Sequence, residues 1–170
     1  VDVYRLCQAS GCRFIQASVT QLDPEQRHLQ LSDGSQLAYD WLSLDVGATP
    51  DLTPIGNDHT SVVPVKPVAS FYARWQQLCQ DTRGQTASLA VVGAGAGGTE
   101  MALAMARHFQ DRQQPADIQL ITGGDLLPGF SASVRKKMRA RLSAHHVTLH
   151  TDTRVHRDAQ QQLRMGDQPL

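Results

Sequence analysis

Three absences narrow the class of protein that this sequence encodes. Its 170 residues contain only three cysteines, an odd number too small for a disulfide scaffold, which predicts a reducing, cytoplasmic location. No apolar run approaches the roughly 18 residues that a membrane span requires. Sixteen basic and sixteen acidic side chains cancel, so no overall field attracts nucleic acid or an anionic membrane. We therefore expect a globular protein that does not bind nucleic acid.

The composition and the distribution of charge predict a folded chain in two parts. Hydrophobic residues make up 41% of the sequence and charged residues 19%, as in ordinary globular domains. Residues 1–86 carry nine acidic and six basic side chains, whereas residues 87–170 carry seven acidic and ten basic ones. The sign of the net charge changes where the residue pattern also changes. We place a domain boundary between residues 86 and 87.

The first part is predicted to contain an antiparallel β-meander between two helices. Gly11 stops the first helix, and Asp33-Gly34 is a strong hairpin signal because both residues tolerate positive φ. The expected elements are a helix over 3–10, strands over 12–22, 27–32, 36–39 and 41–46, a loop over 48–67 and a helix over 68–81.

The second part follows the order strand, glycine-rich turn, helix, strand, which is typical of a βαβ unit with parallel strands. Further helical and extended segments follow, so we assign the chain to the α/β class. The expected elements are strands over 89–92, 118–122 and 147–155, helices over 99–110 and 131–144, and a hairpin over 163–170.

Gly93, Gly95 and Gly98 form a G-x-G-x-x-G pattern between a predicted strand and a predicted helix. In dinucleotide-binding folds the first glycine permits a tight turn, the second admits the pyrophosphate, and the third lets helix and strand pack closely. The helix start adds free N–H groups and a positive dipole end. The alternative is a turn that only packs a helix on a strand. We favour the binding loop because its strand and helix are both present.

The position that recognises the ribose is less regular. An acidic residue normally ends the second strand and accepts the ribose hydroxyls, but here Thr122 stands there and Asp125 follows in the loop. We expect Asp125 or Thr122 to contact the ribose and NADH to be preferred over NADPH, because the nearest arginine, Arg135, lies further along the chain. A plain turn carboxylate is the alternative for Asp125.

Two motifs of the first part resemble known functional motifs, but each departs from its pattern. Residues 44–50 resemble the phosphate loop of an S-adenosylmethionine methyltransferase, but Thr49 replaces a required glycine and Pro50 removes an N–H. Cys7 and Cys12 have the C-x4-C spacing of a redox pair, but Gly11 interrupts the helix between them. We expect a reduced, structural pair of thiols.

The second part is rich in histidines and in basic residues, but neither group has the partners that a metal site or an RNA-binding site requires. No cysteine or carboxylate cluster accompanies the histidines, so we assign no metal and expect them to face solvent. The basic arc of the helix over 131–144 has no stacking aromatics nearby, so we expect a solvated face and not an RNA contact. The histidines concerned are His145, His146, His150 and His156.

The meander, the segment Tyr39–Pro50 and the Gly93 fingerprint together resemble the FAD-dependent pyridine nucleotide-disulfide oxidoreductase superfamily. Within it the sequence is similar to type II NADH dehydrogenases. It is most similar to the NADH dehydrogenase-like half fused to selenide, water dikinase, through the segments 63–67 (VPVKP) and 126–130 (LLPGF).

The resemblance implies a Rossmann-like FAD/NAD(P)-binding fragment with an antiparallel β-meander. Residues 1–86 would be a partial FAD-binding domain with a linker helix, and residues 87–170 an NAD(P)H-binding domain truncated at its C-terminus. Val19 would offer backbone contacts to the adenine of FAD. Gly47 matches the glycine of the family's Ala-Thr-Gly turn near the flavin, although Asp45 and Val46 replace its first two residues.

The resemblance also extends the set of residues around NADH. The pyrophosphate would lie against Gly93, Ala94, Gly95, Gly97 and Gly98. Glu100 matches a family glutamate near the nicotinamide; the alternative is an acid in the first helical turn that suits the helix dipole. No residue is assigned a catalytic role, because the hydride passes from NADH to FAD.

The parent protein implied by the resemblance is an NADH dehydrogenase-like oxidoreductase, cytoplasmic or peripheral to a membrane, with an electron acceptor that the sequence does not name. We expect this stretch alone to be inactive, since it lacks the N-terminal FAD fingerprint of the family. Exposed sheet edges predict a homodimer. The alternative is a non-catalytic NAD(H)-binding or regulatory module fused to a selenium-metabolism enzyme.

Overall fold

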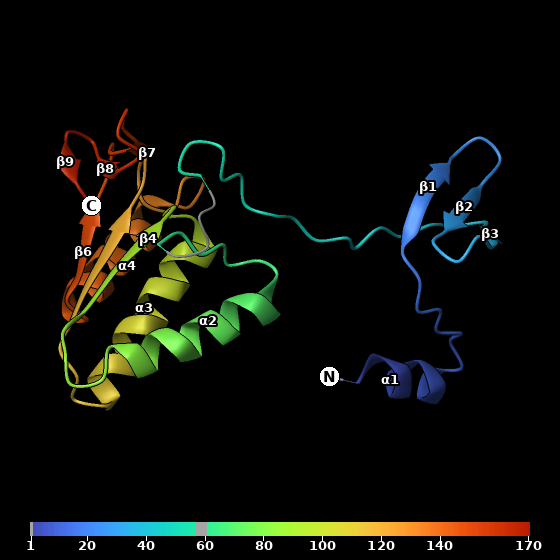
Figure 1. Cartoon of the computed structure of the whole chain (residues 1–170), viewed down its shortest axis with the longest axis horizontal. Helices are drawn as coiled ribbons and strands as arrows, with labels where there is room; N and C mark the ends of the chain where they lie inside the picture. Colours follow the sequence, from blue (N-terminus) through green and yellow to red (C-terminus); the bar gives the residue numbers. More distant parts are fainter. Residues whose placement is uncertain (1, 57–60) are drawn as a thin grey trace. The chain divides into compact units, whose positions relative to one another are not determined.

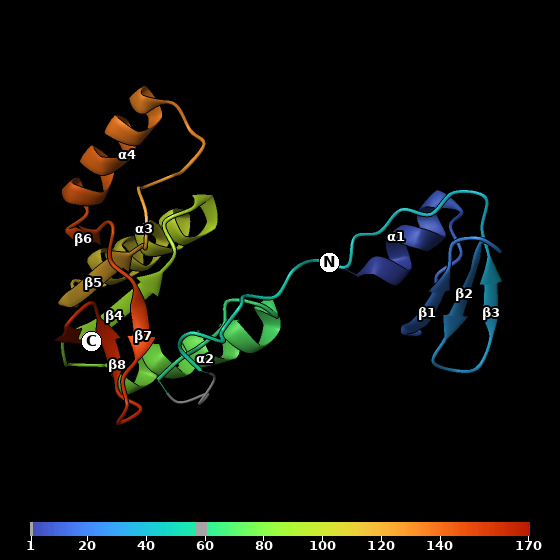
Figure 2. The ribbon, with the colours of Figure 1, turned by 90° about the horizontal axis from the view of Figure 1, so that it is seen from above.

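The computed structural model describes residues 2–56 and 61–170 and divides into two compact units, Val1–Gly47 and Ala48–Leu170. Figures 1 and 2 show the helices and strands of each unit. The structural division lies at residue 47, whereas the sequence placed a boundary after residue 86. The helix over 68–81 therefore belongs with the glycine-rich half. The assignment of FAD and NAD(P)H to separate domains stays a prediction.

The first unit contains the predicted helix and the predicted meander. α1 (Val3–Ser10) ends at Gly11, whose φ of 71° is left-handed, a conformation that glycine adopts without a steric penalty. Three antiparallel strands follow in the order β1-β2-β3. Their bounds are β1 (Val19–Asp23), β2 (His28–Leu31) and β3 (Gln36–Ala38).

Two strand predictions for this unit were wrong: one strand is shorter than predicted, and the other does not form. The strand expected over 12–22 begins only at Val19. The strand expected over 41–46 does not form, and Trp41 and Val46 are 93% and 88% exposed. An apolar run becomes a strand only beside a partner that pairs its N–H and C=O groups. No strand of the described chain pairs with this segment.

The second unit confirms the α/β class and the βαβ order. Its parallel sheet has the strand order β4-β5-β6, and α3 and α4 each connect two of these strands (Figure 1). The elements up to the end of the sheet are α2 (Val68–Asp81), β4 (Ala87–Val92), α3 (Ala96–Asp111), β5 (Ala116–Ile121), α4 (Ala132–Ala144) and β6 (Val147–His150).

The core of this unit lies between the sheet and its helices. Phe109 of α3, Leu120 of β5 and Leu142 of α4 are almost completely buried in one cluster. Trp75 of α2 meets the Phe109 ring edge-on, with 5.8 Å between ring centroids, a favoured aromatic geometry. α2 is thereby fixed to the nucleotide-fingerprint half. No helix in the described residues is long and apolar enough to cross a membrane.

The strand predicted over 147–155 is divided between two sheets. β6 ends at His150, Asp152 adopts a left-handed φ of 53°, and the chain re-enters a separate antiparallel sheet of β7 (Val155–Arg157), β8 (Leu163–Met165) and β9 (Gln168–Pro169). The bend at Asp152 therefore interrupts the predicted strand between His150 and His156. The hairpin over 163–170 is confirmed as β8 and β9.

Candidate functional site

The glycine loop joins the C-terminal end of β4 to the start of α3. β4 ends at Val92, and Gly95 is the N-cap of α3, which begins at Ala96. The helix therefore starts three residues earlier than predicted, and Gly97 and Gly98 occupy its first turn. The first N–H groups of a helix have no partner within the helix. These donors and the positive end of the dipole lie at the position predicted for the pyrophosphate.

Gly93 is required by its backbone conformation and Gly98 by packing. Gly93 has a φ of 105°, which side chains rarely adopt, and its N–H donates to the carbonyl of Ile121 at 2.7 Å. A Cβ on Gly98 would lie 1.8 Å from the Gly93 carbonyl oxygen. The α3 backbone thus packs against the loop at a distance that only glycine permits. Glycine would be needed at these two positions even in a turn that binds no ligand.

Gly95 and Gly97 are different, because nothing in the fold requires them to be glycine. Neither has a left-handed φ, and a Cβ at either position would meet no atom within 4 Å. Glycine inside a helix costs about 1 kcal/mol relative to alanine, so Gly97 weakens α3 without a packing benefit. Open space above a helix start is the property that a pyrophosphate requires. The arrangement therefore favours a binding loop over a packing turn.

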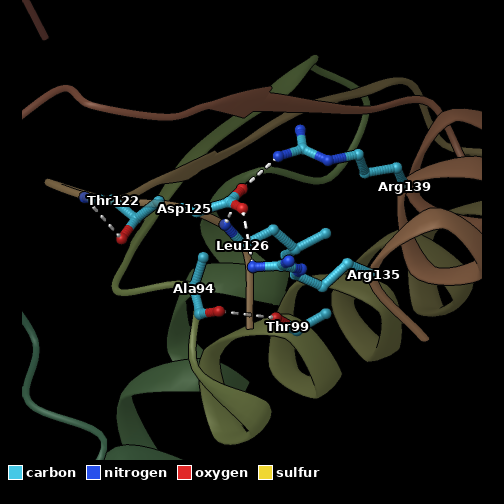
Figure 3. A network of polar contacts seen from close by, with 8 residues as sticks. Ala94, Thr99, Thr122, Asp125, Leu126, Arg135 and Arg139 are labelled. Carbon is cyan, nitrogen blue, oxygen red and sulfur yellow. Dashed lines mark hydrogen bonds and ion pairs between the residues drawn. The ribbon is translucent and has the colours of Figure 1, made fainter. Parts of the chain in front are cut away.

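A second loop, residues 122–127, is joined to the glycine loop by hydrogen bonds. The Leu127 N–H donates to the Ala94 carbonyl at 2.8 Å. From α3, the buried Thr99 hydroxyl donates to the Gly95 carbonyl at 2.8 Å, and Figure 3 shows it directed towards Ala94 as well. Leu126 and Leu127 are buried under the loop. The predicted phosphate and ribose positions consequently belong to one connected structure.

The carboxylate of Asp125 is bound by two arginines of α4 (Figure 3). Arg135 Nη1 lies 3.1 Å from one carboxylate oxygen, and Arg139 Nη2 forms a short contact with the other, which also accepts the Leu126 N–H at 2.7 Å. Both carboxylate oxygens of Asp125 thus already accept hydrogen bonds, while its side chain is 47% exposed. The preference for NADH stays a prediction. The ribose contact itself stays a prediction.

Sequence reasoning missed this arrangement, although a signal for it exists. Arg135 and Arg139 are four residues apart on a predicted helix, a spacing that puts both side chains on one face. Arg135 was considered as the arginine nearest the ribose position and as part of the solvated arc, and Arg139 only as part of that arc. Thr122 has no carboxylate that could accept the ribose hydroxyls. Its hydroxyl oxygen lies 3.5 Å from the Gly124 nitrogen.

Glu100 lies in the second turn of α3, not in its first. The early helix start moves it to the fifth helical position, and the interaction with the helix dipole decreases beyond the first turn. The explanation of Glu100 as a first-turn acid is therefore wrong. Its side chain is exposed. The role near the nicotinamide remains a prediction.

The two positions predicted to contact FAD lie in the first unit and are both accessible. Val19, at the start of β1, is 56% exposed. Gly47 has a φ of 71°, and a Cβ there would meet no atom within 4 Å, so a cofactor could approach its backbone. Their contacts with FAD stay a prediction. Within the described residues of this unit, however, no glycine loop precedes a helix.

The expectation that the histidines of the second part face solvent holds for His146 and His156, which are exposed, but not for His150, whose Nε2 is buried without a hydrogen-bond partner in the described chain. Cys7, Cys12 and Cys79 are free thiols, and the Cys12 N–H donates to the Cys7 carbonyl at 2.8 Å because the chain turns at Gly11. Residues 2–56 and 61–170 contain no group of three or more potential metal ligands.

A parallel sheet with a glycine loop at a helix N-terminus defines a dinucleotide-binding βαβ domain. The chain matches the pyridine nucleotide-disulphide oxidoreductase family over residues 7–167. It therefore belongs to that family, whose members are FAD-dependent oxidoreductases. A comparison with curated proteins finds no match.

Solved structures share the fold at low sequence identity. The ferredoxin reductase for the CYP199A2 system from Rhodopseudomonas palustris is 17% identical, with a TM-score of 0.71 over 94% of this chain. The NAD-dependent persulfide reductase from A. fulgidus is 19% identical, with a TM-score of 0.68 over 96%. The water-forming NADH oxidase from Lactobacillus brevis is 23% identical, with a TM-score of 0.53 over 88%. This chain spans only 38%, 30% and 33% of those chains.

Proposed function

We propose that this chain binds a nicotinamide dinucleotide for a flavin-dependent oxidoreductase. The observation that carries the proposal is the open backbone at Gly95 and Gly97, which have no packing reason to be glycine. The family match supports the reaction class. A structural relative, the water-forming NADH oxidase from Lactobacillus brevis, was solved with NADH bound.

The described residues would divide the nucleotide between two loops. The N–H groups at the start of α3 bind the pyrophosphate, and the loop over 122–127 lies at the adenosine end. Glu100 is accessible on α3 for the nicotinamide side. Bound FAD would supply the hydride acceptor, with Val19 and Gly47 as its accessible backbone contacts. This chain's part is to hold the dinucleotide in a fixed orientation.

The proposal also covers the kind of enzyme to which the parent protein belongs, its electron acceptor and its location. Its resemblance to type II NADH dehydrogenases, and to the half fused to selenide, water dikinase, supports an NADH dehydrogenase-like enzyme. Quinones, selenium species and protein partners are its candidate electron acceptors. The low cysteine content supports a cytoplasmic location.

A non-catalytic nucleotide-binding module is the second candidate. It is favoured by the first unit, whose segment over 41–46 forms no strand and leaves Trp41 93% exposed. The two functions differ in flavin content. A full-length parent that purifies with flavin and is reduced by NAD(P)H is an oxidoreductase; a colourless parent that binds the dinucleotide is a module.

The test of nucleotide binding is calorimetric titration of the chain with NADH and with NADPH. Gly95→Val adds a side chain to open space, so we expect the fold to persist and affinity for both nucleotides to fall at least about tenfold as the pyrophosphate is blocked. Ala104→Val, at an exposed position of the same helix, is the matched control and should bind normally. Unchanged affinity in Gly95→Val, with equal melting temperatures, would contradict the proposal.

A further inference from the structure

We propose that Arg135 and Arg139 form a recognition pair for the 2′-phosphate of NADPH, and that Asp125 holds this pair and not the ribose. The inference rests on the proposed function, because it names which dinucleotide the same site prefers. It reverses the preference for NADH that the sequence predicted.

The two guanidinium groups are held together at the adenosine end of the site. Both come from the same face of α4, and each gives one N–H to a different oxygen of Asp125 (Figure 3). Asp125 itself is fixed through the Leu126 N–H, and two residues later Leu127 donates to the Ala94 carbonyl of the glycine loop. The arginine pair is therefore tied to the loop predicted to hold the pyrophosphate.

Most of the hydrogen-bonding capacity of the pair is unused. A guanidinium has five N–H donors, and each arginine gives one to Asp125, with no other acceptor for either among residues 2–56 and 61–170. Paired planar donors of this kind match a phosphate in geometry as well as in charge. The side chains of Arg135 and Arg139 are 35% and 46% exposed, so a ligand can reach them.

The charge at this edge favours an added phosphate. Two guanidinium groups around one carboxylate leave a net charge of +1. A third, Arg154, packs against Gly123, with its Cγ 3.0 Å from where a Cβ would stand. The 2′-phosphate is the only group that distinguishes NADPH from NADH, and it adds negative charge here.

The feature that would reject NADPH is missing. Sites selective for NADH place an acid at the end of the second strand, where it binds the ribose hydroxyls and repels a phosphate. Thr122 stands at that position, and Asp125 in the loop that follows is neutralised by the pair. Asp152, the acid that follows β6, lies beside this loop, and its backbone N–H donates to the Gly124 carbonyl at 3.0 Å. Gly123 and Gly124 carry no side chain that would block the approach.

The experiment measures the dissociation constants of the 170-residue chain for NADPH, NADH, 2′,5′-ADP and ADP. We expect NADPH and 2′,5′-ADP to bind at least about tenfold tighter than their counterparts without the 2′-phosphate, the size of one or two charge-assisted hydrogen bonds. The double variant Arg135→Gln/Arg139→Gln should lose this preference, while its affinity for NADH and ADP changes less than about twofold. Lys137→Gln/Arg141→Gln removes the same two charges from exposed positions of α4 that do not contact Asp125, and should keep the preference.

Asp125→Asn separates the two roles of the carboxylate. If Asp125 holds the arginines, the variant binds NADH within about twofold of the original chain, whereas a carboxylate that accepts the ribose hydroxyls would weaken NADH at least about tenfold when lost. That second result, or equal binding of ADP and 2′,5′-ADP, would overturn this inference and leave the proposed function intact. Binding of no nucleotide at all would overturn both.

Discussion

Four glycines of one loop serve two different purposes at the scale of single residues. Gly93 and Gly98 allow the chain to turn and α3 to pack closely, whereas Gly95 and Gly97 leave space. A substitution series can separate these purposes because both classes occur within the same six residues, 93–98. Stability should report on one class and ligand affinity on the other.

Gly98→Ala and Gly97→Ala should change stability in opposite directions. The Cβ added at Gly98 would overlap the Gly93 carbonyl oxygen, so we expect a loss of more than about 2 kcal/mol in the free energy of unfolding. Gly97→Ala meets no atom and gains helix propensity, so we expect an increase of about 0.5–1 kcal/mol. Denaturant unfolding measures both. A stable Gly98→Ala variant would show that α3 does not pack as described.

At the scale of elements, α2 is attached to α3 through His108. Its imidazole Nε2 lies 3.3 Å from Cys79 Sγ, and its ring meets Trp75 edge-on at 4.9 Å. Burial, with a smaller contribution from the positive charge of Arg112, lowers the pKa of His108 below its ordinary value, and burial raises the pKa of the Cys79 thiol. Both groups are therefore held in their neutral forms in this contact.

This contact predicts a dependence of stability on pH. Below about pH 6.5 the imidazole is protonated in the unfolded chain, while the folded chain, with its lowered pKa, stays neutral until a lower pH. Stability should therefore fall as pH drops from about 6.5 through the folded pKa. Melting temperatures at pH 7.5 and 5.5 should differ more in the original chain than in His108→Gln, which cannot be protonated. His156→Gln, at an exposed position, is the control; equal losses in all three would refute the prediction.

The elements that could be predicted were those whose signal is local. The βαβ unit was found because Gly93 to Gly98 separate an apolar strand from an amphipathic helix, and Asp33-Gly34 fixed the meander. The helix start at Ala96 was missed because Gly97 and Gly98 are typical of turns.

Two other features depend on contacts that the sequence does not show. The strand predicted over 41–46 was wrong because an apolar pattern indicates burial, not the presence of a pairing strand. The pairs from Asp125 to Arg135 and Arg139 were missed because they depend on how the loop over 122–127 folds back, with Leu127 at a φ of 50°.

At the scale of the whole molecule, each unit presents surface that suits a second copy. In the described chain the parallel sheet ends at β4 on one side and at β6 on the other, and such edges have unpaired backbone groups. In the first unit Tyr4, Leu6 and Trp41 are 54%, 57% and 93% exposed. A second copy that covered these side chains would remove apolar surface from water.

We therefore expect the chain to self-associate. The mass measured by light scattering should rise towards that of a dimer as the protein concentration increases. Leu6→Glu together with Trp41→Glu should reduce association if the first unit provides the contact, whereas association that persists would point to the edges of the parallel sheet. A strictly monomeric mass at high concentration in the unmodified chain would contradict the prediction.

Placing Arg135 and Arg139 on the exposed side of α4 also has an evolutionary consequence. The same helix anchors the fold through the buried Leu142, so the surface proposed to meet the ligand can mutate without disturbing the core. A lineage could exchange one nicotinamide coenzyme for the other by a few solvent-facing substitutions that leave the glycine loop unchanged. The choice between the NADH pool and the NADPH pool of the cell would then be set by substitutions that barely change the free energy of unfolding.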